Sequence, residues 1–403
     1  MTVMRQIINI ILLVLLYFPA NAQVEKNHYL AGLANLQRKE FKQAVAEFDK
    51  AIEAKTYEYY YYLKRGEAYF WLGEYLKAKA DFNEASQLER YSGSMGLAMT
   101  YAKIGDIDLA FRHLEDHLRS TFRVSEKSIK LNKAFESIEN SRKWVELWRK
   151  RWYNSFEILE QEIDYLSKTA HYPEALELIE VYFSKYPDNA GAYALKGRIN
   201  FAQGNIREAE VNFTKAISLD SENPNFRKRR ADVYVKSGNF PNAVKDISYA
   251  LKSDPSMFNL YIKRAGLYHR MDAGEKALTD LTLYLDYFPA DEEALHLFGK
   301  IYIDQGKYYS ALKYFSINVE NHSENPRSFI DRADAYVLSE NYKYAIMDYG
   351  MALDLDPINP ATWISRGKVY IKMGNNKQAC YDLIRAVRLK SREGVKLYKE
   401  YCE

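Results

Sequence analysis

A pair of histidines is the feature of this 403-residue sequence with the most obvious potential for chemistry. His113 and His117 lie one helical turn apart and could together chelate a metal ion, with Glu115 and Asp116 between them. The span reads His-Leu-Glu-Asp-His, whereas a zinc-protease helix carries a glutamate directly after its first histidine. We therefore expect a packing or solvated role for both histidines and no metal site.

Other catalytic patterns are missing from the sequence. It has no phosphate-binding glycine loop, no serine nucleophile elbow and no pair of cysteines at zinc-binding spacing. We expect no catalytic residue and no cofactor, so the protein is predicted not to be an enzyme. An enzyme with an unrecognised site is the alternative.

The two cysteines could form a disulfide bond. Cys380 lies about ten residues before an expected turn near Lys390, and Cys402 lies about as far after it. Antiparallel helices would bring the two sulfur atoms to a similar height, and an oxidising compartment would let them react. Two buried free thiols are the alternative.

Arginine and aspartate recur as a pair sixteen residues apart. The five pairs are Arg65 and Asp81, Arg230 and Asp246, Arg264 and Asp280, Arg332 and Asp348, and Arg366 and Asp382. Where Lys196 or Phe298 replaces the arginine, Asn212 or Tyr314 replaces the aspartate. We expect each pair to be a structural salt bridge between two helices, because the planar guanidinium suits a carboxylate.

The elements that position these residues follow from a repeat of alanine. Alanines recur every 34 residues from Ala175 through Ala209, Ala243, Ala277, Ala311 and Ala345 to Ala379, and the series begins earlier at Ala44 and Ala78. A fixed period of this length predicts stacked helix pairs instead of a single globular core. Such an array offers an extended surface, so binding is the expected function.

Around the alanines, small and large residues follow one pattern. The fullest match is Gly66, Tyr69, Gly73, Tyr75, Ala78, Phe82 and Ala85, and a second match is Gly197, Gly204, Ala209, Phe213 and Ala216. This pattern resembles the tetratricopeptide repeat. The resemblance implies an all-α fold, a right-handed α-solenoid of about ten helix-turn-helix units. The units begin near residues 25, 59, 91, 156, 190, 224, 258, 292, 326 and 360.

The phasing also predicts the turns and the domains. Six glycines occupy the fifteenth place of their units, where the turn between the helices favours positive φ. We expect three repeats over residues 23–118, a divergent Trp-rich helical connector over 119–155, seven repeats over 156–390 and a capping helix over 391–403. Trp144, Trp148 and Trp152 should share one helix face in the connector. Packing is favoured over membrane contact, because tryptophans at helical spacing are usually core residues.

The first 22 residues have the features of a signal peptide. Arg5 precedes an apolar stretch, and Ala20-Asn21-Ala22 forms a small-residue cleavage site. We expect export, with the periplasm of a Gram-negative cell first and secretion second. A formal net charge of +3 is too small to indicate a nucleic-acid partner.

In proteins that resemble this one, binding uses the fifth, ninth, twelfth and thirteenth places of the first helices. The candidate groove residues are Phe70, Trp71, Arg198, Phe201, Lys228, Lys236, His269, Arg270, His296, Lys300, Lys368 and Lys372. Basic residues outnumber acidic ones at these places in the last six units, which favours a protein or peptide partner with acidic groups and apolar anchors. We expect a scaffold of the cell envelope. The alternative is a glycan- or peptidoglycan-binding module that uses the groove aromatics.

Overall fold

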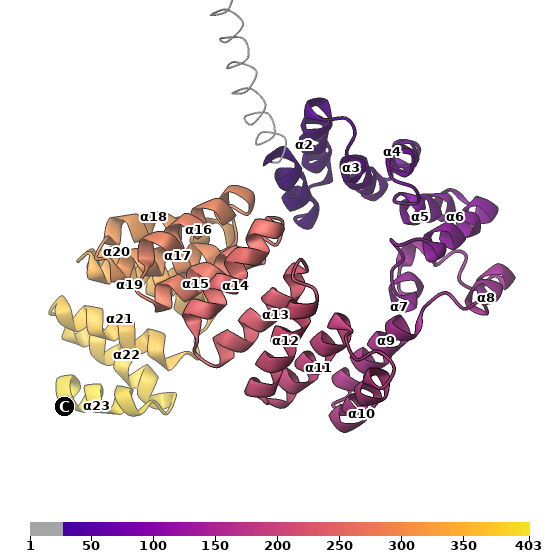
Figure 1. Cartoon of the computed structure of the whole chain (residues 1–403). Helices are drawn as coiled ribbons and strands as arrows, with labels where there is room; N and C mark the ends of the chain where they lie inside the picture. Colours follow the sequence, from indigo (N-terminus) through magenta and orange to yellow (C-terminus); the bar gives the residue numbers. More distant parts are fainter. Residues whose placement is uncertain (1–26) are drawn as a thin grey trace, which may run out of the picture. The chain divides into compact units, whose positions relative to one another are not determined.

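A computed structural model describes residues 27–403, and the predicted signal peptide lies outside the described residues. In the described part every regular element is a helix, beginning with a helix over residues 27–37 (Figure 1). The helices of the first compact unit, which ends at Ser256, are α2 (Phe41–Ala54), α3 (Tyr59–Trp71), α4 (Tyr75–Leu88), α5 (Ser94–Ile104), α6 (Ile107–Arg119), α7 (Glu126–Lys130), the 3₁₀ helix η1 (Lys133–Phe135), α8 (Arg142–Trp148), α9 (Ser155–Lys168), α10 (Tyr172–Phe183), α11 (Ala190–Gln203), α12 (Ile206–Leu219), α13 (Pro224–Lys236) and α14 (Phe240–Ser253).

The second unit runs from Met257 to Glu403. Its helices are α15 (Asn259–Arg270), α16 (Gly274–Tyr287), α17 (Glu292–Asp304), α18 (Tyr308–Asn321), α19 (Pro326–Leu338), α20 (Tyr342–Leu355), α21 (Pro360–Lys372), α22 (Asn376–Arg388) and α23 (Arg392–Cys402). None of the helices in residues 27–403 is long and apolar enough to cross a membrane.

Consecutive helices pack as pairs, as the alanine period predicts. Each pair corresponds to one expected repeat, such as α3 with α4, α11 with α12, and α19 with α20. The alanines of the series are completely buried, from Ala44 to Ala379. A methyl group is the largest side chain that fits where two helices approach this closely, so the period marks the core of each hairpin.

The turns inside the hairpins share one backbone conformation. The six glycines at the fifteenth place have positive φ, between 70° at Gly306 and 85° at Gly204. In the other four repeats a non-glycine residue takes the left-handed conformation at that place: Lys39, Ala170, Asp272 and Glu340, with φ between 55° and 63°. The conformation is therefore imposed by the hairpin and not by glycine alone.

Each arginine of the repeated pairs forms a bidentate contact with its aspartate. In the pair of Arg230 and Asp246, Nε and Nη2 lie 2.8 Å and 2.9 Å from the two carboxylate oxygens. The other four pairs have the same geometry at 2.6–2.9 Å. All five aspartates are buried, so each ion pair joins the two helices of one hairpin away from solvent.

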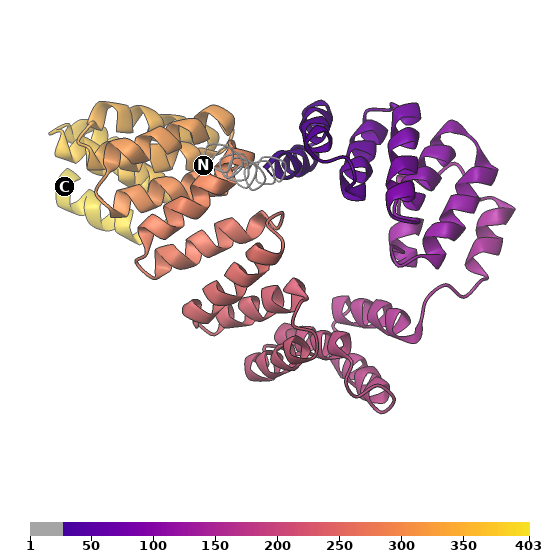
Figure 2. The ribbon, with the colours of Figure 1, turned by 45° about the horizontal axis from the view of Figure 1, so that its top comes forward.

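The connector differs from its predicted form. It contains three short helical segments, α7, η1 and α8, and residues 149–154 between α8 and α9 are not helical (Figure 2). The prediction that Trp144, Trp148 and Trp152 share a helix face is therefore wrong for Trp152, because α8 ends at Trp148. The Trp152 indole instead donates a hydrogen bond to the Leu147 carbonyl at 2.8 Å and packs on the cluster around Trp144.

The C-terminal helix α23 packs on α22 and covers the last repeat. Leu397 and Tyr398 contact the cluster formed by Ile364, Leu383 and Ala386. In this structure Cys380 of α22 and Cys402 of α23 are joined by a disulfide bond, with their Cα atoms 5.6 Å apart. The bond therefore attaches the end of the chain to the last hairpin.

Candidate functional site

The first unit contains an apolar hollow of about 470 Å³, which we call the N-terminal groove. It is formed by α3, α4, α5, the end of α6 and the connector. Its lining residues are Leu63, Lys64, Glu67, Phe70, Trp71, Phe82, Ser92, Met95, Gly96, Met99, His117, Phe122, Val124, Ser128 and Asn132. Apolar side chains provide most of this surface.

Helix α3 contributes the four places expected from the repeat pattern. Trp71 is 55% exposed and stacks on Phe41, with ring centroids 6.3 Å apart and planes at 18°. Phe70 is only 5% exposed, packs edge-to-face against Trp71 and lies at a tilted angle to the ring of Tyr75. Of the two aromatic candidates on α3, Trp71 is therefore available to a partner and Phe70 belongs mainly to the core.

The floor of the N-terminal groove depends on a close helix approach. A Cβ atom on Gly96 of α5 would lie 2.4 Å from the ring of Phe82. The missing side chain lets α5 rest directly on that ring, between the flexible side chains of Met95 and Met99. Methionines adapt their shape to a partner, which suits a binding floor.

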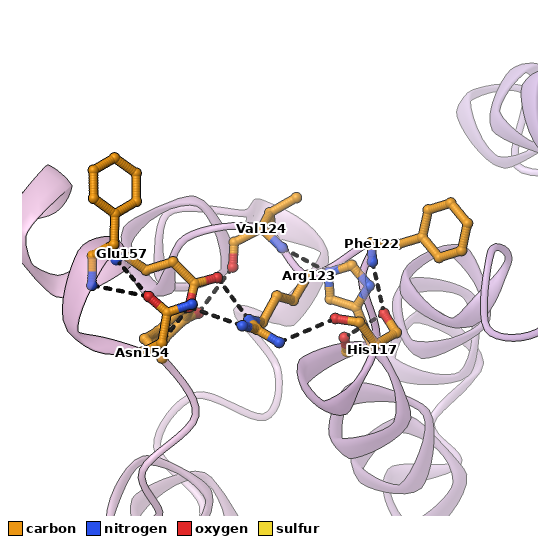
Figure 3. Close-up of polar contacts among 9 residues, drawn as sticks. His117, Phe122, Arg123, Val124, Asn154 and Glu157 are labelled. Carbon is orange, nitrogen blue, oxygen red and sulfur yellow. Dashed lines mark hydrogen bonds and ion pairs between the residues drawn. The ribbon is translucent and has the colours of Figure 1, made fainter. Parts of the chain in front are cut away.

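The connector forms one wall of the N-terminal groove, a position that no pattern in the sequence predicted. The buried His117 ring accepts a hydrogen bond through Nε2 from the Val124 backbone N–H at 3.1 Å (Figure 3). The Ser120 hydroxyl accepts from the Phe122 N–H at 3.1 Å. These bonds fix the loop that presents Phe122 and Val124. Desolvation lowers the pKa of His117 to about 4, so the ring is neutral near pH 7.

An ion pair anchors the same loop to α9. Arg123 Nε and Nη2 lie 2.8 Å and 2.9 Å from the two carboxylate oxygens of Glu157. Glu157 also accepts from the Asn154 N–H, while the Asn154 side chain caps the first turn of α9 (Figure 3). The Arg123 guanidinium holds the pKa of Glu157 below its ordinary value. The Asn-x-x-Glu spacing at 154–157 was the available sequence signal for this joint.

The histidine pair does not form a chelate. The His113 ring lies parallel to Tyr101, with centroids 5.4 Å apart, while His117 is directed to Val124. No cluster of three or more potential metal ligands occurs in residues 27–403. Both histidines therefore have packing roles, which is one of the two roles expected for them.

The second unit has a smaller hollow of about 270 Å³, the C-terminal groove. It is lined by Lys300 and Ile303 of α17, Asp331, Asp334, Val337 and Leu338 of α19, and Phe315 and Tyr349 below them. The Tyr349 hydroxyl donates a hydrogen bond to the Asp334 carboxylate. Burial raises the pKa of Tyr349 above its ordinary value, so this hydroxyl stays protonated as a donor.

The predicted basic residues do not form a continuous free basic strip. Arg198, Lys228 and Lys236 belong to the first unit, and the other basic candidates belong to the second. Several basic side chains face carboxylates: His296 with Asp331 at 2.6 Å, Lys368 with Glu393 at 2.6 Å, His269 with Asp304 at 3.4 Å, and Arg198 with Asp164 at 3.4 Å.

Lys300 is exposed at the rim of the C-terminal groove, and Lys372 lies 5.8 Å from the ring of Tyr342. Lys236 and Arg270 are exposed, Lys228 is half-buried, and Phe201 packs beside Phe213. The four places considered in each repeat do not include Asp331, Asp164 and Glu393, the carboxylates that pair with His296, Arg198 and Lys368. The surface therefore has mixed charge.

Comparison with known proteins identifies the repeat. Residues 190–223 match the sequence model of the tetratricopeptide repeat, in the same phase as the fifth predicted unit. The chain is a helical repeat protein that is similar to tetratricopeptide repeat proteins. Over 81 residues it is 37% identical to a tetratricopeptide-repeat-containing thioredoxin of Arabidopsis thaliana, a match that covers 20% of this chain and 12% of that protein.

A longer match is with the Hsp70–Hsp90 organizing protein of Triticum aestivum, 23% identical over 266 residues. It covers 66% of this chain and 41% of that protein, so the chain spans less than half the length of both curated relatives. Among solved structures, the C-terminal part of a tetratricopeptide repeat protein from Cytophaga hutchinsonii aligns with a TM-score of 0.53 at 14% identity. That alignment covers 59% of this chain and 98% of the other, and it shows the fold alone.

Proposed function

We propose that this protein is a non-catalytic scaffold that binds segments of other proteins in its N-terminal groove. The observation that carries the proposal is Trp71, a large aromatic side chain 55% exposed above an apolar floor. Exposed tryptophan beside an apolar pocket is typical of binding hot spots. Tetratricopeptide repeats and a relative named as an organizing protein for two chaperones support a role in protein–protein interaction.

The chemistry of the N-terminal groove favours an apolar segment. Lys64 and Glu67 form an ion pair at 2.8 Å on the same helix, so the rim carries little net charge. Met95, Met99 and Phe122 offer adaptable apolar contacts and few hydrogen-bonding groups. We therefore place apolar anchors in the N-terminal groove. The preference for acidic groups stays a prediction for the mixed-charge surface of the second unit.

We also propose that the protein works in the cell envelope after export. The signal-like pattern of residues 1–22 supports export, and the bond between Cys380 and Cys402 suits an oxidising compartment. Fractionation of cells that express the tagged chain tests the location. Recovery of the full-length protein in the cytoplasm, with its first 22 residues retained, would contradict this part of the proposal.

A crosslinking pull-down from envelope extract tests the binding site. Trp71→Glu places a charge in the N-terminal groove, whereas Leu76→Glu places one at a 73%-exposed site on α4 outside it. We expect Trp71→Glu to lose a protein partner that wild type and Leu76→Glu both retain. Equal recovery by all three forms would show that the N-terminal groove is not the binding site.

A glycan-binding module is the second candidate, and the stacking of Trp71 on Phe41 is the observation that favours it. A flat exposed indole held by a second ring can serve as a platform for a sugar. Binding of peptidoglycan fragments to wild type, and its loss in Trp71→Ala, would support this candidate. The scarcity of hydrogen-bonding groups in the N-terminal groove favours the peptide instead.

A further inference from the structure

Helix α20 exposes an apolar face that the other repeats do not have. Six residues of this helix are exposed, and four of them are apolar: Tyr344 at 57%, Met347 at 65%, Met351 at 49% and Leu355 at 43%. Ile358, 74% exposed, follows just beyond the helix. At 100° per residue the four side chains fall within one narrow arc, and they extend along almost the whole helix. We call the four residues Tyr344, Met347, Met351 and Leu355 the α20 stripe.

The other repeats provide a comparison within the same chain. At the places of the α20 stripe, the preceding repeat has Ser310, Lys313, Ile317 and Asn321, and the following repeat has Gln378, Tyr381, Arg385 and Leu389. The repeat of α12 has Glu208, Val211, Lys215 and Leu219. Packing of the hairpin therefore does not require apolar residues at these places. Contiguous exposed apolar surface of this kind typically marks an interaction site.

The two exposed charges on α20 indicate what covers the stripe. Lys343 lies near the start of the helix and Asp354 near its end, both on one edge of the stripe. In an antiparallel pairing with a second copy of α20, centred between Met347 and Met351, Tyr344 would face Leu355 and Met347 would face Met351. The same pairing would place Lys343 opposite Asp354 of the second copy. The stripe and its charges are thus complementary to themselves under a two-fold axis.

We propose that this protein self-associates through α20, as a two-fold symmetric dimer with antiparallel α20 helices. Tyr344 stacks on Tyr336, with ring centroids 5.3 Å apart, so its side chain is held in place before contact. The two copies of Tyr344 would lie at the two ends of the dimer interface. Helix α20 has 14 residues and is about 21 Å long. One helix pair of this length buries less than the roughly 1,600 Å² of a standard interface. The dimer is therefore weak and forms at high concentration.

Sedimentation equilibrium of the purified chain tests the proposal over a wide range of concentration. Wild type should pass from monomer to dimer as the concentration rises. Met347→Lys with Met351→Lys should weaken association at least about tenfold. These substitutions copy the lysines that the chain carries at the same places in other repeats, Lys313 and Lys215, so the fold should persist, as circular dichroism would check.

Val211→Lys is the matched control. Val211 is 67% exposed at the place equivalent to Met347, but polar residues flank it on α12. This variant should associate like wild type. A wild-type chain that stays monomeric at every concentration would overturn the proposal, and so would a dimer that the two lysines leave intact.

Charge exchange tests the antiparallel arrangement. Lys343→Asp should weaken the dimer, because the new carboxylate would face Asp354 of the second copy. Adding Asp354→Lys should restore association to near the wild-type level, since the two charges are then exchanged. A double variant that associates no better than the single variant would overturn the antiparallel pairing. None of these substitutions touches the N-terminal groove, so failure here leaves the proposed function separately testable.

Discussion

His117 makes the joint between α6 and the connector sensitive to pH. Its pKa of about 4 in the folded protein compares with 6.5 for an unperturbed histidine, so unfolding lets the ring bind a proton more readily. Its contribution to stability is complete above about pH 6.5 and is lost as the pH falls toward 4. The loss amounts to about 3 kcal/mol at the acid end, because each pKa unit corresponds to about 1.4 kcal/mol.

Urea unfolding between pH 7.5 and pH 4 measures this effect. His117→Gln is the reference variant, since glutamine does not titrate while the carboxylates of the protein titrate in both forms. The stability difference between wild type and variant should shrink by about 3 kcal/mol over the range. A difference independent of pH would show that His117 is not held neutral by burial.

Removing one partner of a repeated ion pair should destabilise the protein strongly, whereas replacing both partners together should destabilise it less. Arg230→Ala leaves the carboxylate of Asp246 buried without its partner, so we expect a loss of about 3 kcal/mol. The double variant Arg230→Lys with Asp246→Asn copies the pair Lys196 and Asn212 of the preceding repeat. It should lose clearly less than Arg230→Ala in chemical denaturation. A larger loss in the double variant would contradict the view that the pair is a unit.

At the scale of the hairpin, the left-handed turn strains the backbone wherever its fifteenth place is not glycine. Glu340 and Ala170 take φ values of 60° and 59°, which cost a non-glycine residue about 1 kcal/mol or more. Glu340→Gly and Ala170→Gly should therefore raise stability by about 0.5–1 kcal/mol each in thermal or urea unfolding.

The reverse substitution provides the control for this strain. Gly238 has a φ of 77°, and a Cβ atom there would meet nothing within 4 Å. Gly238→Ala should therefore destabilise by about 1 kcal/mol through the backbone alone. If both directions of substitution leave the midpoint of unfolding unchanged, the turn is not strained.

The bond between Cys380 and Cys402 should stabilise the capping helix. It closes a loop with a sequence separation of 22 residues, which corresponds to about 3 kcal/mol in the loop-entropy model. Cys380→Ser with Cys402→Ser should lower the stability of the second unit by an amount of this order. Thiol titration under denaturing, non-reducing conditions provides the direct test, and two free thiols would rule the bond out.

The hairpins were predicted well from the sequence because the same residue types recur at the same places of each repeat, for the same structural reason. Buried alanines, left-handed turns and arginine–aspartate pairs recur in one register, so an error at one repeat is corrected by the others. The connector occurs once and has no such support. Ser125, Asn132 and Ser141 each cap a short segment there, and the spacing of the tryptophans gave no sign that α8 stops at Trp148.

The N-terminal groove was predictable only in part for a related reason. Trp71 could be located from its place in the repeat, because α3 follows the common pattern. Phe122 and Val124 reach the same hollow from a loop whose path depends on the buried His117 and on the pair of Arg123 and Glu157. The first contact spans seven residues and the second spans 34. Both begin at residues next to or within a connector that occurs once in the chain, so the other repeats offer no parallel from which they could be predicted.

At the scale of the whole molecule, contacts within each unit join elements that are close in the chain. In the second unit, a helix packs on its neighbours and on the helix two positions away, as α21 does with α22 and α23. Stability should therefore be a sum of local terms, in contrast to a globular domain that unfolds as one cooperative body. A binding surface on one repeat can then change with little effect on distant repeats.

Hydrogen exchange can measure how far a local defect spreads. Asp382→Ala leaves the Arg366 guanidinium half-buried without its carboxylate partner, in the hairpin of α21 and α22. With nearest-neighbour coupling, exchange should accelerate most in α21, α22 and α23, less in α19 and α20, and little in α15 and α16. Equal acceleration throughout the second unit would show instead that its repeats unfold together. A substitution in one repeat would then be expected to change the stability of all of them.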